Sequence, residues 1–339
     1  TLRLGSGLKM CVRWASCARS VAFTSVRWAS CRSVRSTSVR AVSVAVRSLT
    51  WLAWFSACAL GSLLALALDS RPWGPEALAA VFTDWNRGPL ESFLIELTAE
   101  ILTVRDEKTG GFLVEQVLDK AGQKGTGRWT AQEALELGVS VPCIAAAVDA
   151  RLMSSQKEKR QVASTILQGP NGLEVSVPTT DLVAQAHDAL HAAKIVDYAQ
   201  GLDLIATASR KYDWAIDLSE VARIWKGGCI IRARLLDSIM RAYNSRPDLP
   251  NLLLDEGLSA TIHSLQPGWR EVVGLAQHQG VPVGGLASSL AYFDSYRTAD
   301  LPQNLTQAQR DAFGAHTYQR RDDPDGDFVH TEWLSASEG

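Results

Sequence analysis

Residues 121–130 combine side chains that suit an anionic ligand. They read Ala-Gly-Gln-Lys-Gly-Thr-Gly-Arg-Trp-Thr, with glycines at 122, 125 and 127. Glycine lets the backbone approach a ligand closely, while Lys124 adds a mobile positive charge and Thr126 a hydroxyl group. The spacing differs from that of the phosphate-binding loop of nucleoside triphosphatases. Two interpretations are open: an anion-binding loop, or an ordinary turn ahead of a helix.

Three other side chains suit the same chemistry. Arg151 ends a predicted apolar helix, where a guanidinium can form paired hydrogen bonds with a phosphate, although many helix-end arginines are merely solvated. Arg310 and His316 bracket a Phe-Gly-Ala turn. A single histidine is more often structural than functional. The residue types therefore mark candidates for anion binding without identifying a catalytic group.

Two further motifs are rejected. His187 and His191 have the spacing of a zinc-protease helix, but Asp188 replaces the required glutamate and no third ligand stands out, so we predict an exposed helix face and no metal site. Residues 5–7 read Gly-Ser-Gly but lack the third glycine, the preceding strand and the later acidic residue of a dinucleotide-binding fingerprint.

The first 68 residues differ from the rest of the chain. They carry nine Lys and Arg residues, no Asp or Glu, four of the six cysteines, and a six-residue repeat at 12–17 and 26–31. Residues 1–48 are too rich in Ser and Arg to pack a core, whereas 49–68 form an uncharged stretch long enough to span a bilayer. We consider a shifted reading frame, a membrane anchor or signal, and an organelle transit peptide.

The remaining residues have a net charge of −11, which argues against general nucleic-acid binding. Their two cysteines, Cys143 and Cys229, give no disulfide framework and suggest a reducing compartment, so we expect a cytoplasmic protein. Membrane attachment or organelle targeting is the alternative, and it requires a genuine segment at 1–68.

Helical periodicity dominates from about residue 70. Pro75 suits a first helical turn, and Leu78, Val81, Phe82 and Trp85 follow at helical spacing. A second stripe runs from Leu90 through residues 93, 94 and 97 to Ile101. Thr130 and Glu133 predict a capping box that opens a helix towards Arg151. Further helices are predicted at 180–212, 219–244, 250–264, 267–278 and 284–297, with no strand ladder.

The expected organisation is a mainly α domain at 70–316 followed by an extended C-terminal tail at 317–339. The residues before about 70 are expected to be irregular or to form one hydrophobic helix. In the tail, the polar run 320–327 is followed by Phe328, Val329 and Trp333. This order predicts an arm that binds a surface outside its own domain.

Seven segments together resemble the 6-phosphogluconate dehydrogenase family over about residues 75–333. They are the two candidate anion-binding runs at 121–130 and 309–316 and the blocks at 84–88, 92–98, 194–201, 224–232 and 292–297, in the family's order. The resemblance implies the multi-helix C-terminal domain of that family. It also implies NADP-dependent oxidative decarboxylation of 6-phosphogluconate to ribulose 5-phosphate, without a metal.

The resemblance assigns roles to the candidates above. Lys124 and Arg151 would bind the sugar phosphate, with Thr126 nearby. Arg310 and His316 would lie on a C-terminal segment that a partner subunit lends to the neighbouring site, so a homodimer with exchanged tails is expected.

The same resemblance exposes a gap before Pro75. In the family, a segment similar to Lys-Met-Val-His-Asn-Gly-Ile-Glu-Tyr carries the catalytic lysine and glutamate there, and an N-terminal Rossmann domain binds NADP. Residues 50–67 contain no Lys, Glu, His or Asn. We therefore predict no catalytic residue, no identifiable cofactor-binding residue and no turnover by the chain as given. The alternative function is a non-catalytic helical dimerisation module, membrane-tethered if 49–68 is an anchor.

Overall fold

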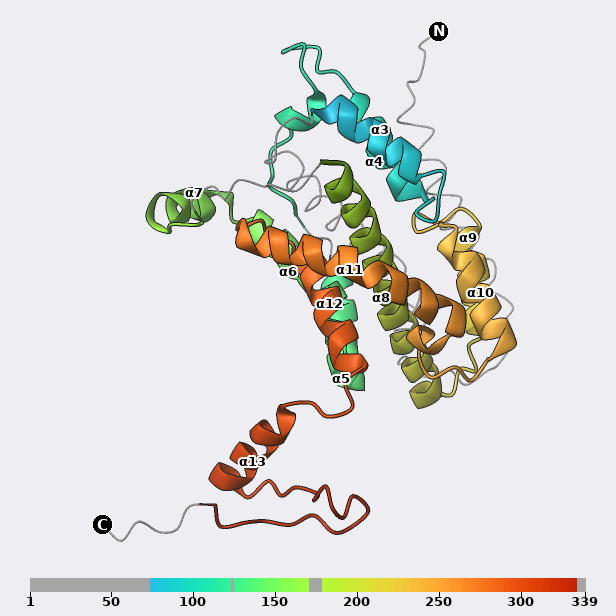
Figure 1. Cartoon of the computed structure of the whole chain (residues 1–339), viewed down its shortest axis with the longest axis vertical. Helices are drawn as coiled ribbons and strands as arrows, with labels where there is room; N and C mark the ends of the chain where they lie inside the picture. Colours follow the sequence, from blue (N-terminus) through green and yellow to red (C-terminus); the bar gives the residue numbers. More distant parts are fainter. Residues whose placement is uncertain (1–73, 123–124, 171–178, 334–339) are drawn as a thin grey trace. The chain divides into compact units, whose positions relative to one another are not determined.

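A computed structural model describes residues 74–122, 125–170 and 179–333 of the 339. The predictions for 1–48 and 49–68 lie outside these ranges. Within them the chain is helical, and its β-structure is limited to isolated bridges, which confirms the predicted mainly α fold. The helices, shown in Figure 1, are α3 (Pro75–Trp85), α4 (Phe93–Thr103), α5 (Thr126–Leu137), α6 (Pro142–Ser154), α7 (Lys157–Ile166), α8 (Thr179–Tyr212), α9 (Leu218–Lys226), α10 (Leu235–Ser245), α11 (Glu256–His278), α12 (Gly284–Tyr296) and α13 (Gln303–Gly314), with 3-10 turns η1 (Leu113–Gln116) and η2 (Leu252–Leu254).

The chain divides into two compact units, one ending at Leu290 and the other beginning at Ala291. The first, which we call the helical unit, contains α3 to α11 and most of α12. The second, which we call the tail unit, contains the end of α12, α13 and the tail. None of the helices in the described ranges combines the length and apolar character needed to cross a membrane.

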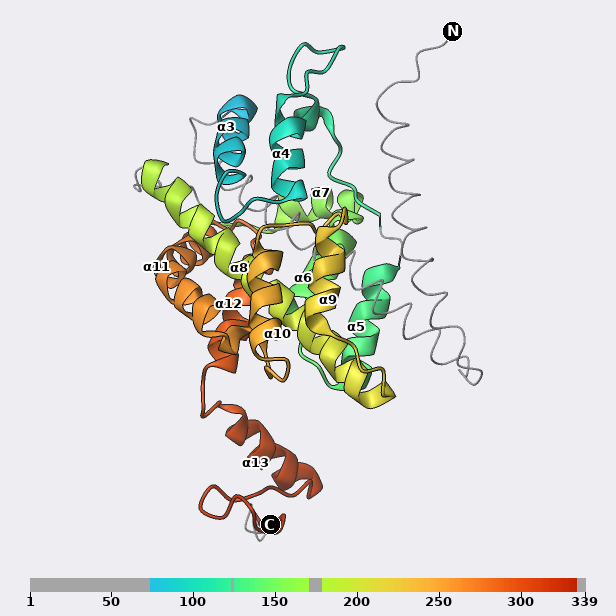
Figure 2. The same ribbon diagram turned by 90° about the vertical axis from the view of Figure 1, so that its right-hand side faces the viewer.

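The core of the helical unit forms where α8 and α11 cross (Figures 1 and 2). The middle of α8 is buried around most of its circumference, as expected for a helix surrounded by others. In α11 the buried residues recur every three or four positions, and Trp269 at the centre has no exposed surface. Burial of these side chains drives the assembly of the unit.

Gly268 allows α8 and α11 to approach closely. A Cβ atom at this position would lie 2.9 Å from Oδ2 of Asp188 and 3.1 Å from Cα of Gln185, both on α8. Gly268 follows Pro267, which lies inside α11 without ending it. The glycine is therefore required by the helix crossing and not by a turn.

Three predicted helices differ in extent or continuity from those in the structure. The helix expected at 219–244 is interrupted after α9 by Gly227 and Gly228, the latter with a φ of 106°, and resumes as α10. The two helices expected at 250–264 and 267–278 are η2 and one continuous α11, whose N-terminus is capped by the Asp255 carboxylate. Leu265 and Trp269, on either side of Pro267, are both buried. Their packing keeps α11 continuous where a break was expected.

The predicted capping box is also wrong. Thr130 lies inside α5, its hydroxyl donating to the carbonyl of Thr126 at 3.2 Å, and the helix begins four residues earlier after Gly125 with a φ of 91°. Gly138 ends α5 and Pro142 begins α6, so the single helix expected towards Arg151 is a helix pair. Positive φ favours glycine at both boundaries.

The α3 helix buries Leu78, Phe82 and Trp85 as predicted, whereas the second stripe is displaced. Leu90 is buried before α4 begins, α4 itself buries Ile95 and Leu102, and Ile101 is 45% exposed. The reason is a bridge between Ser92 and Ala233, which fixes the start of α4 against the segment before α10.

Candidate functional site

The glycine-rich run leads into the N-terminus of α5. Thr126 is the first residue of this helix and is half-buried, and Gly127 is buried behind it. Helix N-termini present free backbone N–H groups and a partial positive charge, both of which favour an anion. Lys124 lies outside the described residues, so its predicted role stays a prediction.

Arg151 lies in the last turn of α6 and reaches the same run. Its Nη2 donates to the carbonyl oxygen of Gly122, which places the guanidinium beside the loop that precedes Thr126. Arg151 therefore contacts the glycine-rich run, 29 residues away in sequence. A guanidinium at a loop before a helix N-terminus suits a phosphate group.

A second set of contacts, which was not predicted, holds this loop to the end of α6. The Ser154 hydroxyl donates to the carbonyl of Asp119 at 3.0 Å and accepts from the Ala121 N–H at 2.9 Å. Arg160 of α7 binds the Asp119 carboxylate at 2.9 Å, and Lys157 binds it at 2.5 Å. These two cations lower the pKa of Asp119. Nothing in the sequence pairs residues 119 and 160, because the contact depends on how α6 and α7 turn.

In the tail unit, Arg310 and His316 are both exposed. Arg310 lies near the end of α13, where its Nη1 donates to the side-chain oxygen of Gln307 at 3.0 Å. The His316 ring lies against Gly314, where a Cβ atom would be 2.9 Å from Nε2. Two accessible groups that can carry positive charge thus flank the turn that ends α13.

Asp311, which was not among the predicted site residues, lies between Arg310 and His316 in sequence and is fully buried. Its Oδ1 accepts from the Thr317 N–H and the His330 ring, and its Oδ2 accepts from the Thr331 N–H and the Trp333 indole. Burial alone would raise the pKa of Asp311, but these hydrogen bonds outweigh it and the pKa is lowered. The hydrogen bond to Asp311 raises the pKa of His330. The only sequence signal was an acidic residue inside a candidate motif.

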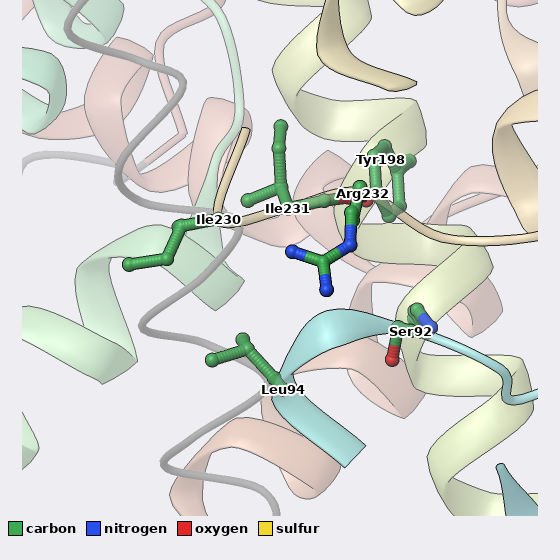
Figure 3. Close-up of a pocket in the computed structure, with 7 residues that line it drawn as sticks. Ser92, Leu94, Tyr198, Ile230, Ile231 and Arg232 are labelled. Atoms are coloured by element: carbon green, nitrogen blue, oxygen red, sulfur yellow. Dashed lines mark hydrogen bonds between the residues drawn. The ribbon is translucent and has the colours of Figure 1, made fainter. Parts of the chain in front are cut away.

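Two buried charged residues on α8 form no part of the predicted site. Lys194 donates to the carbonyl of Leu90 at 3.4 Å, and burial lowers its pKa to about 7. Neither carboxylate oxygen of Asp197 has a hydrogen-bond partner, and burial raises the pKa of this group. Lys194 also helps to line a small pocket (Figure 3) with Ser92, Leu94, Tyr198, Ile230, Ile231 and Arg232. Of the predicted anion-binding residues that the structure describes, Thr126, Arg151, Arg310 and His316, none lines that pocket.

The region around His187 and His191 differs from the prediction in one respect. The two rings lie 6.0 Å apart, but His191 is buried, so the predicted exposed face is wrong. Burial, together with His187 and Lys194, lowers the pKa of His191 to about 4. Across the described ranges, no group of three or more His, Cys, Asp or Glu residues has the arrangement of a metal site.

Comparisons with known proteins cover most of the chain. The family described as "6-phosphogluconate dehydrogenase, C-terminal domain" matches residues 66–333. The decarboxylating 6-phosphogluconate dehydrogenase of Synechocystis is 54% identical over 260 residues, which are 76% of this chain and 54% of the relative. The NADP(+)-dependent enzyme of Bacillus subtilis is 51% identical over 259 residues, 76% of this chain and 55% of the relative.

A solved structure shows the same architecture. Plasmodium falciparum 6-phosphogluconate dehydrogenase has a TM-score of 0.80 at 38% identity, over 85% of this chain and 62% of that chain. That protein has been solved in its apo form, with its cofactor NADP+ and with its substrate 6-phosphogluconate. The present chain spans about half the length of the curated relatives it matches.

Proposed function

The chain belongs to the 6-phosphogluconate dehydrogenase family, and from this premise we propose that it is the substrate-binding and dimerisation part of such an enzyme. The reaction proposed for the whole enzyme is the NADP-dependent oxidative decarboxylation of 6-phosphogluconate. The part played by the described residues is to hold the phosphate end of the sugar acid. Binding remote from the reacting carbons orients the substrate for chemistry carried out by other groups.

The observation that supports this role is the hydrogen bond from Arg151 to the carbonyl of Gly122. It holds the guanidinium at the loop that leads to Thr126, where α5 begins. A phosphate bound there would meet a bidentate donor, the Thr126 hydroxyl and the N-terminus of a helix. We propose that Lys124, on the same loop, supplies the second positive charge.

We further propose that Arg310 and His316 of the partner subunit complete the site in a homodimer with exchanged tails. Helix α13 buries only Asp311, and the tail unit exposes apolar side chains on and beyond that helix. The largest exposed fractions belong to Leu305, Phe313 and Phe328. Apolar surface of this kind is typical of a protein interface.

NADP does not fit the part of the chain that the structure describes. A dinucleotide site of the Rossmann type needs a strand, a glycine-rich turn and a helix in succession. The described ranges contain isolated bridges and no such strand. The proposal therefore includes no step that depends on the cofactor.

The phosphate site is tested by titrating the full chain with 6-phosphogluconate in a calorimeter. Arg151→Ala should weaken binding about tenfold to a hundredfold, the usual effect of losing hydrogen bonds to a charged group. Arg223→Ala, which removes an exposed arginine paired with Glu220 on α9, is the matched control and should bind normally. Gluconate, which lacks the phosphate, should bind wild type weakly. Equal affinity of wild type and Arg151→Ala would refute the proposed site.

Tail exchange is tested by complementation. In a dimer with exchanged tails, pairing an Arg151→Ala chain with an Arg310→Ala chain leaves one site with both arginines. A purified heterodimer of differently tagged chains should therefore bind one 6-phosphogluconate with wild-type affinity. If each subunit used its own tail, both sites would lack an arginine and neither would recover.

A further inference from the structure

The turn that carries His316 is under conformational constraint. Ala315 and Thr317, on either side of the histidine, have φ angles of 47° and 55°. Residues other than glycine rarely adopt positive φ angles, so other contacts must hold the backbone there. The constraint lies next to a residue of the proposed phosphate site.

Asp311 and Gln307 supply those contacts from α13. The Thr317 N–H donates to Asp311 Oδ1 at 2.9 Å, and the Gln307 side-chain amide donates to the Thr317 carbonyl at 2.6 Å. The Ala315 N–H donates to the Asp311 carbonyl at 2.8 Å. Both backbone groups of Thr317 are therefore tied to one helix, which fixes where His316 lies.

The same carboxylate holds the final part of the described tail. The His330 ring donates to Oδ1 at 2.9 Å, while the Thr331 N–H and the Trp333 indole donate to Oδ2 at 3.0 and 2.7 Å. Each oxygen thus accepts two hydrogen bonds, the usual capacity of an ionised carboxylate. Hydrogen bonds between Tyr318 and Val329 join the two tail segments.

We propose that Asp311 is a positioning residue for the proposed substrate site. It holds the turn after α13 so that His316 is presented to the phosphate in the neighbouring subunit. This inference rests on the proposed function, because it needs His316 to contact the substrate. Because Asp311 itself is buried, its proposed role is to act through His316 and not by direct contact with the substrate.

The experiment compares five forms of the full chain by titration with 6-phosphogluconate: wild type, His316→Ala, Asp311→Asn, Asp311→Asn with His316→Ala, and Asp325→Asn. Asparagine keeps the shape of Asp311 but replaces an acceptor oxygen by a donor that would face existing donors. Asp325→Asn makes the same chemical change at an exposed tail position. Hydrogen exchange of the Thr317 and Thr331 amides is followed in parallel.

Asp311→Asn should weaken binding about tenfold or more, as His316→Ala does, and should accelerate exchange at both amides. The double variant should bind no more weakly than His316→Ala alone, because a residue that acts through His316 has nothing left to position. A purely structural role would instead give additive losses. Asp325→Asn should behave as wild type.

Two results would overturn the inference while leaving the proposed function intact: wild-type affinity for Asp311→Asn beside weakened His316→Ala, or additive losses in the double variant. Wild-type affinity for His316→Ala would refute both the inference and the proposed role of His316. Trp333→Phe is a milder variant for the case in which Asp311→Asn does not fold. It removes one hydrogen-bond donor to Asp311 and keeps the carboxylate. It should lower the affinity by a smaller factor, and an unchanged affinity would count against the inference.

Discussion

The helical unit and the tail unit are held together by different interactions. Helix α11 buries an apolar residue at nearly every turn, whereas α13 buries one residue, the carboxylate of Asp311. Apolar burial is non-directional and accumulates with area, while hydrogen bonds contribute less net stability but fix geometry. The helical unit is therefore a stable scaffold, and the tail unit is an ordered arm whose apolar surface remains exposed in the single chain.

The two units also differ in how their buried ionisable groups are hydrogen-bonded. In the helical unit, Asp197 lacks a hydrogen-bond partner and Lys194 has one long contact. In the tail unit, Asp311 has four donors within 3.0 Å. Burial of an ionisable group is unfavourable unless its hydrogen bonds are replaced. The same substitution should therefore have opposite effects in the two units.

The largest effect is expected at the centre of the helical unit. Trp269→Ala should lower the free energy of unfolding by about 3–5 kcal/mol, because it removes a large side chain with no exposed surface and leaves a cavity. Urea unfolding followed by circular dichroism measures this loss. Trp333→Ala, in the exposed tail, is the control and should change the unfolding of the helical unit little. Equal losses from both would contradict the division into two units.

Lys194→Met should stabilise the helical unit in a pH-dependent way. The pKa of the Lys194 amine is about 7 in the folded chain, below the ordinary 10.5. Between these two pH values the amine is therefore protonated in the unfolded chain and neutral in the folded chain. Wild-type stability thus rises with pH across that window, and the full free-energy cost of burying the charged amine is present below pH 7. The gain from methionine should be a few kcal/mol at pH 6, at about 1.4 kcal/mol per pKa unit, and smaller at pH 9. A gain that did not vary with pH would contradict the burial of a charged amine.

Asp197→Asn should also stabilise the helical unit, with the opposite trend. Because the folded pKa of Asp197 is raised, the unfolded chain loses its proton first, and wild-type stability falls as the pH rises above about 4. The gain from asparagine should be about 1–3 kcal/mol at pH 8, the usual cost of a buried polar group without a partner, and smaller at pH 5, as measured by unfolding at both values. Asp311→Asn is the matched substitution in the tail unit, where it should loosen the structure instead. Destabilisation by Asp197→Asn at pH 8 would show that this carboxylate is partnered in solution.

The smallest effect on stability is expected at Phe313, which is 76% exposed on α13. Phe313→Glu should change the free energy of unfolding by less than about 0.5 kcal/mol, as is usual for surface positions. It should nevertheless shift sedimentation towards the monomer, because a charge would enter the proposed dimer interface. Leu135→Glu, at a similarly exposed position on α5, should leave the oligomeric state unchanged. If the Phe313→Glu variant formed dimers of normal affinity, Phe313 of α13 would lie outside the dimer interface.

Local sequence patterns were enough to predict much of the fold. The stripe at Leu78, Phe82 and Trp85 and the long helix near 180–212 follow from helical spacing alone, and the structure has both. The errors lie where one segment depends on another, such as the displaced stripe of α4, which follows from the bridge between Ser92 and Ala233. A pattern within ten residues contains no information about such a partner.

Residue types and spacings were enough to predict the helical class, the family and four described candidates for anion binding, because these are local properties of the chain. Three relations appear only in the folded chain: Arg151 lies beside Gly122, α5 begins at Thr126, and Asp311 holds the His316 turn. Those relations join residues far apart in the chain or depend on burial. Hydrogen bonds and pKa values at such places are set by neighbours that folding alone brings together.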